Sequence, residues 1–245
     1  MNYVVYKMST KEIIEAMCMY SFVAVIVAYL FYDSFYAIGF FVLVIPVYLK
    51  YIKNILRSKR LNVLTEHFCK MMESIDTSIS AGLSIENAFR EALTEMEKLY
   101  GCDADIVMEL RMITQKMNLN QTLEDAFMDF AKRSTIEDIR DFADIFCELK
   151  RCGGNMKEVI GRTVMHMTQK HETEMEIEML LNGKMLEMRV MCIVPFIIIT
   201  YLRISSGEFL DVLYHNAAGI FIMTVCLIVY VVAVYLSKRI TNIEV

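Results

Sequence analysis

The residue types best suited to chemistry gather in one charged stretch of the sequence, which holds His166, His171, Glu172, Glu174 and Glu176. In a helix, residues three apart share a face, so His171 and Glu174 could contact one metal ion. Helical bundles that bind iron or manganese supply several matching Glu-x-x-His pairs from different helices. The sequence offers no such set, so we interpret these side chains as solvated charge and expect no metal.

The sequence also does not support other catalytic functions. A histidine followed by an acid, as in His171-Glu172, suggests the phosphoacceptor helix of a sensor kinase, but an apolar segment follows where an ATP-binding domain is needed. No phosphate loop, dinucleotide-binding glycine pattern, GxSxG or HExxH motif occurs. The net charge of −5 argues against nucleic acid as a partner. We therefore predict a protein that is not an enzyme, with no catalytic residue and no cofactor.

The distribution of apolar residues predicts a membrane protein. Hydrophobic residues make up 56% of the chain and gather at its two ends, whereas most of the charge lies between Lys50 and Arg189. A membrane span needs roughly 20 apolar residues. Four spans are expected, at about 13–32, 35–52, 187–203 and 217–236. Pro195 removes one backbone donor and is expected to kink the third span.

These spans divide the chain into three parts. An N-terminal transmembrane hairpin is placed at 1–52, a helical domain at 53–186, and a C-terminal transmembrane hairpin at 187–245. Basic residues directly follow the second and fourth spans, and the positive-inside rule then places both termini and the central domain in the cytoplasm. Those basic residues are Lys50, Lys53, Arg57, Lys59, Arg60, Lys238 and Arg239.

The sequence predicts that the central domain is a bundle of about six helices. From Leu61 onward apolar residues recur at helical spacing, and no strand pattern interrupts them. The chain has only two prolines and nine glycines, which favours an all-α fold.

Glycines and capping residues mark the expected helix ends. Gly82 and Gly153-Gly154 are expected to occupy turns that a side chain would obstruct. Residues expected to cap the start of a helix are Ser84, Thr122, Ser134 or Thr135, and Asn155.

Two helix–glycine–helix segments carry a family resemblance. SISAGLSIENAF at 78–89 and KRCGGNMKEVIGRTV at 150–164, the latter followed by a long charged helix and an apolar span with a proline, resemble the two signatures of the type II secretion F-domain family. The resemblance covers Leu61 to about Leu202. Larger members carry two such domains, so this sequence is most similar to the short platform proteins of the tight adherence (Tad) pilus.

The resemblance implies a platform subunit of the bacterial inner (cytoplasmic) membrane in a Tad or type IV-like pilus or a type II secretion machine. The implied partners are an assembly ATPase, pilins or pseudopilins, the membrane, and a second F-domain platform protein or further copies of the chain. The subunit would couple the ATPase mechanically to pilin extraction and polymerisation.

Three acidic residues, Glu86, Asp138 and Glu158, are hypothesised to contact the ATPase, with ordinary solvated surface as the alternative. Two other functions stay open on the sequence. One is a small transporter or channel subunit with a cytosolic regulatory bundle, although the span cores hold no charge. The other is a scaffold for a signalling complex.

Overall fold

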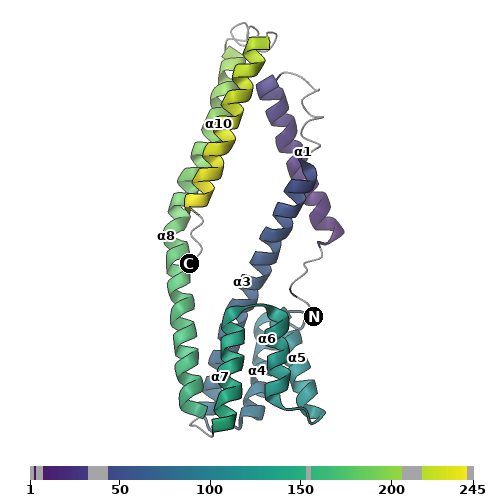
Figure 1. Ribbon diagram of the computed structural model, residues 1–245, viewed down its shortest axis with the longest axis vertical. Helices are drawn as coiled ribbons and strands as arrows, with labels where there is room; N and C mark the ends of the chain where they lie inside the picture. Colours follow the sequence, from purple (N-terminus) through teal and green to yellow (C-terminus); the bar gives the residue numbers. More distant parts are fainter. Residues whose placement is uncertain (1–2, 4–7, 33–43, 153–155, 206–216, 242–245) are drawn as a thin grey trace. The chain divides into compact units, whose positions relative to one another are not determined.

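The computed structural model describes residues 3, 8–32, 44–152, 156–205 and 217–241, and its regular structure there is entirely α-helical (Figure 1). This confirms the all-α fold class, with long apolar helices and a central helical bundle. In chain order the helices are α1 (Thr10–Tyr32), α3 (Ile45–Ser80), α4 (Ile85–Tyr100), α5 (Asp105–Asn118), α6 (Leu123–Ser134), α7 (Glu137–Cys152), α8 (Met156–Ser205) and α10 (Ala217–Thr241).

The chain forms two compact units. The bundle unit comprises Met1–Lys7 and Lys53–Thr173, and the apolar unit comprises Met8–Ile52 and Glu174–Val245. The boundaries after Ile52 and Thr173 fall inside α3 and α8, so both helices contribute to both units without a linker. The end of the expected second span and the helical pattern from Leu61 onward belong to one helix, α3, which begins at Ile45.

In the bundle unit, α4, α5, α6 and α7 pack consecutively, each against the next (Figure 1). Their apolar faces close around a core of phenylalanine rings. The ring of Phe127 on α6 lies at its centre and is only 1% exposed. Ring centroids 5.3–6.4 Å from that of Phe127 belong to Phe68, Phe89, Phe130, Phe142 and Phe146. Aromatic pairs at such distances stabilise a core beyond the area they bury.

Thr122 caps α6 as expected, since its Oγ1 accepts a hydrogen bond from the backbone N–H of Asp125 at 3.3 Å. The expectation that Ser134 or Thr135 caps the next helix is wrong. Ser134 is the last residue of α6, and Thr135 follows it in the left-handed conformation (φ 61°). The carbonyl of Ile136 accepts the first bond of α7 from Arg140, so an apolar residue occupies the capping position.

The apolar unit contains α1, the first turns of α3, the second part of α8, and α10. Within the described residues, three helices are long and apolar enough to cross a membrane, at Thr10–Phe31, Lys157–Ser205 and Gly219–Ser237. The first half of the expected second span, 35–43, lies outside the described residues.

Helices α1, α8 and α10 contact one another through a few large side chains. The ring of Phe196 lies 6.1 Å from Phe31 and 5.6 Å from Tyr230, centroid to centroid. Other apolar side chains on these helices are open, such as Phe22 (70% exposed) and Ile204 (84% exposed). Apolar surface of this extent calls for a lipid or protein environment.

The position of Phe127 generates a stability prediction. Phe127→Ala removes a ring from the centre of the core, and we expect a loss of about 3–5 kcal/mol in the free energy of unfolding. The control is Leu119→Ala, because Leu119 is 75% exposed and its loss leaves no cavity. The chain has no tryptophan, so thermal unfolding in detergent is followed by circular dichroism. Equal melting temperatures for the two variants would contradict the described core.

Candidate functional site

The turn between α3 and α4 contains two of the residues singled out from the sequence. Gly82 has φ +95°, a region that L side chains rarely adopt. Its N–H donates to the carbonyl of Ile79 at 3.0 Å, and the N–H of Leu83 donates to the carbonyl of Ser78 at 3.1 Å. This bond pair is the Schellman motif, which satisfies the last carbonyls of a helix. Ser84 occupies the N-cap of α4.

The start of α8, which belongs to the second helix–glycine–helix segment, lies at the same end of the bundle. Gly153, Gly154 and Asn155 themselves are outside the described residues. Just beyond them, Lys157 Nζ donates to the carbonyl of Ser80 at 3.2 Å, linking the start of α8 to the end of α3. The structure therefore brings the two segments together, and we call this part of the bundle the turn end.

A close approach between α3 and α8 continues from the turn end. A Cβ placed on Gly161 of α8 would lie 3.1 Å from Oδ1 of Asp76 on α3. Two turns further along α8, Thr168 Oγ1 donates to Glu73 Oε1 at 3.3 Å. Gly161 thus permits the two helices to pack closely where they border the phenylalanine core.

The three acidic residues proposed as ATPase contacts do not form one site. Glu86 and Glu158 are exposed in the first turns of α4 and α8, both at the turn end. Glu158 pairs with Arg162 one turn along its own helix. Asp138 lies in the first turn of α7, at the opposite end of the bundle, and is paired with Lys170 at 2.7 Å.

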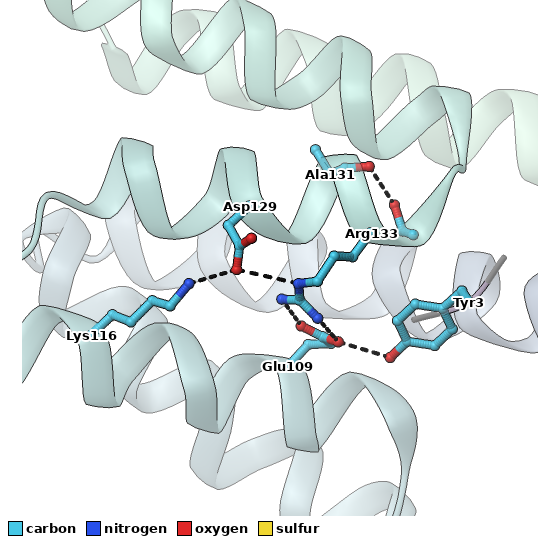
Figure 2. Close-up of polar contacts among 7 residues, drawn as sticks. Tyr3, Glu109, Lys116, Asp129, Ala131 and Arg133 are labelled. Carbon is cyan, nitrogen blue, oxygen red and sulfur yellow. Dashed lines mark hydrogen bonds and ion pairs between the residues drawn. The ribbon is translucent and has the colours of Figure 1, made fainter. Parts of the chain in front are cut away.

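The bundle contains a fully buried carboxylate, that of Glu109, which was not predicted from the sequence. Glu109 on α5 is 0% exposed, and Arg133 on α6 donates to it with both terminal nitrogens, Nη1 to Oε1 at 2.7 Å and Nη2 to Oε2 at 2.6 Å (Figure 2). Arg133 Nε also donates to Asp129 Oδ2 at 3.2 Å, and Lys116 Nζ donates to the same atom at 2.6 Å. A cation–carboxylate chain therefore ties α5 to α6.

These contacts change the ionisation of the groups involved. Hydrogen bonds to Glu109 raise the pKa of Arg133, which keeps the guanidinium charged beside the buried carboxylate. The hydrogen bond from Lys116 lowers the pKa of Asp129, despite partial burial. Since folding lowers this pKa, Asp129 stabilises the fold at neutral pH, and that contribution disappears as the pH falls through the folded-state pKa.

Tyr3 completes the buried group from a distant part of the chain. Its Oη donates to Glu109 Oε1 at 3.0 Å (Figure 2). Its backbone N–H donates to the carbonyl of Arg133 at 3.4 Å. Burial, followed by the charge of Glu109, raises the pKa of the Tyr3 hydroxyl, so it stays a donor. A signal existed in the sequence, because Glu109 occupies the apolar face of α5 between Ile106 and Ile113.

Pro195 lies inside α8, as expected from the sequence. A proline has no N–H, so in the preceding turn the carbonyl four residues earlier, that of Met191, has no helical donor. Tyr230 of α10 donates its hydroxyl to the carbonyl of Cys192 at 2.7 Å, in that turn. The α8–α10 contact therefore includes a hydrogen bond at the proline.

The histidine-rich stretch lies in the first half of α8. Among the residues described, no three His, Cys, Asp or Glu side chains are close enough together to hold a metal ion. His166 is exposed, and His171 is half-buried in the same helix.

The fold and these sites define a class of protein: an all-helical chain with long apolar helices and a helical bundle that has a phenylalanine core and one buried ion pair. Comparison with known families is more specific, because the family described as Type II secretion system (T2SS), protein F, matches residues 71–202, more than half of the chain. No curated protein and no solved structure matches. The chain belongs to the type II secretion system protein F family, whose members are non-catalytic multi-pass platform proteins of the inner membrane in secretion and pilus machinery.

The buried pair generates the second prediction. Arg133→Met leaves Glu109 charged and without its main partner, and we expect a loss of about 3 kcal/mol in the free energy of unfolding. Adding Glu109→Gln should recover part of that loss, because an amide is less costly to bury than an unpaired carboxylate. Circular dichroism melts of the purified protein give the comparison.

The matched control is Arg162→Met, which breaks an exposed pair on α8 and should change stability by less than about 1 kcal/mol. If Arg133→Met is as mild as this control, or if Glu109→Gln worsens it, the buried pair does not stabilise the bundle as described.

Proposed function

We propose that this chain is the platform subunit of a Tad or type IV-like pilus, or of a related secretion machine, and that it couples a cytosolic assembly ATPase to pilin extraction. The observation that carries the proposal is the continuity of α8, which runs as one helix from Met156 in the bundle unit to Ser205 in the apolar unit. A continuous helix transmits displacement, whereas a flexible linker absorbs it.

The Tad assignment is supported by the layout of the chain. One F-like helical domain, proposed at 53–186, lies between apolar segments proposed as hairpins at 1–52 and 187–245. The basic residues that follow the second and fourth spans support a cytoplasmic location for both termini and for the domain. In this arrangement the apolar unit guides pilin transmembrane helices, and a second F-domain protein or further copies complete the platform.

The turn end is the proposed ATPase surface. Two observations favour it over the other end of the bundle. The two helix–glycine–helix segments lie together there, and Glu86 and Glu158 are both exposed there. Asp138 lies at the other end, where Lys170 already neutralises its charge, so we expect a smaller contribution from it.

The third prediction tests this surface by photo-crosslinking in native membranes. A benzoylphenylalanine in place of Glu86 should form an adduct with a secretion-type ATPase, identified by mass spectrometry. The matched control carries the same group in place of Lys98, which is exposed near the other end of α4, and should form little or none.

Recovery of a transport ATPase or a solute receptor from position 86, with no secretion ATPase, prepilin or second F-domain protein, would contradict the platform proposal. An ATPase adduct from position 98 but not from position 86 would contradict docking at the turn end and indicate docking at the other end of the bundle.

A further inference from the structure

The beginning of α3 carries an unusual run of charge. Between Ile45 and Leu64 the helix holds five cations and no carboxylate, although the chain as a whole has a net charge of −5. These cations are Lys50, Lys53, Arg57, Lys59 and Arg60. Nearby anions would stabilise such a run of positive charge, because like charges on one helix repel each other.

The described part of the protein supplies an anion to only one of the five. Arg60 donates to both carboxylate oxygens of Asp105, each at 2.6 Å. The other four form no ion pair with any described residue, and the Nε of Arg57 is buried without a hydrogen-bond partner there. Elsewhere in the bundle unit cations such as Arg111, Lys116 and Lys170 are paired.

Three of the unpaired cations share one face of α3. At about 100° per residue, Lys50, Lys53 and Arg57 fall within a sector of about 60°. We call these three the α3 basic face. Lys59 projects from the opposite side of the helix, about 180° from Lys50.

The location of this face along α3 is fixed by a ring contact in the apolar unit. The rings of Tyr48 on α3 and Tyr20 on α1 are 4.8 Å apart. Tyr20 lies ten residues, about 15 Å, inside a helix able to span a membrane. Arg57 lies nine residues, about 13 Å, beyond Tyr48 along α3. The basic face thus covers the end of the part of α3 that belongs to the apolar unit and the first residues of the helix beyond it.

We propose that the α3 basic face binds the phosphodiester headgroups of anionic phospholipids. The proposal rests on the orientation given under the proposed function, which puts this part of α3 at the cytoplasmic surface, where anionic lipid attracts juxtamembrane cations. Arginine suits the task, because its guanidinium can donate two parallel hydrogen bonds to phosphate oxygens. Anchored in this way, α3 would resist sliding through the bilayer when force acts on the bundle unit.

The test uses the purified full-length protein in a neutral detergent, with dioctanoyl phosphatidylglycerol as the probe and native mass spectrometry as the readout. We expect tighter binding of this lipid than of dioctanoyl phosphatidylcholine. Because each juxtamembrane cation contributes a similar attraction, Lys53→Gln with Arg57→Gln should weaken binding roughly 30-fold. Lys53→Arg with Arg57→Lys keeps both charges and should bind within about twofold of the wild type.

The matched control is Lys59→Gln, which removes one charge from the opposite side of the same helix and should weaken binding at most about fivefold, the share of a single juxtamembrane cation. Circular dichroism melts confirm that each variant is folded.

A loss of lipid binding with Lys59→Gln as large as with the double variant, or no preference over phosphatidylcholine, would overturn the proposal. Equal competition by inorganic phosphate would show a general anion site instead of a lipid site. No ATPase or pilin enters the assay, so its result is independent of the platform proposal.

Discussion

The rest of the structure depends on one unbroken helix, α8, whose first part packs in the bundle core and whose last part belongs to the apolar unit. Over its first turns Ile160, Val164 and Met167 are buried in the bundle core. Towards its end it presents apolar side chains such as Ile204 to the outside. Helical backbone bonds are internal, so the same helix can cross from a protein core into lipid without leaving polar groups unsatisfied. Where Pro195 removes a donor, the hydroxyl of Tyr230 bonds to a carbonyl in the preceding turn.

In the proposed coupling, force passes along α8 to or from the bundle, and this requires that the bundle does not deform. The phenylalanine core around Phe127 and the bidentate pair between Arg133 and Glu109 both join α5, α6 and their neighbours. Buried ion pairs seldom add much net stability, but they penalise every arrangement that separates the partners. We infer that this pair restricts how α5 and α6 can move, which suits a family whose members act as platforms between other proteins.

The sequence predicted the all-helical class, the positions of most helices and the family, because apolar periodicity decides which face of each helix is buried. Ser84 and Gly82 stand out by residue type alone, since few other residues favour those backbone conformations. The pairing of Glu109 with Arg133 and Tyr3 could not be predicted, because it joins residues far apart in the chain that only packing brings together. The helix boundary at Ser134 was misplaced because the same residue types occur at both ends of helices.

The most direct test of the account changes the stiffness of α8 without changing its length. Asn182, Gly183 and Lys184 are exposed, and a Cβ on Gly183 would meet nothing within 4 Å. Asn182→Gly with Lys184→Gly creates three consecutive glycines, while alanine at all three positions is the matched control, since glycine costs about 1 kcal/mol per residue relative to alanine in a helix. Fibre or secretion output is then measured in cells expressing each variant at equal level. The account predicts that the glycine variant loses output while the alanine variant keeps it. Full output from the glycine variant would contradict mechanical coupling through α8.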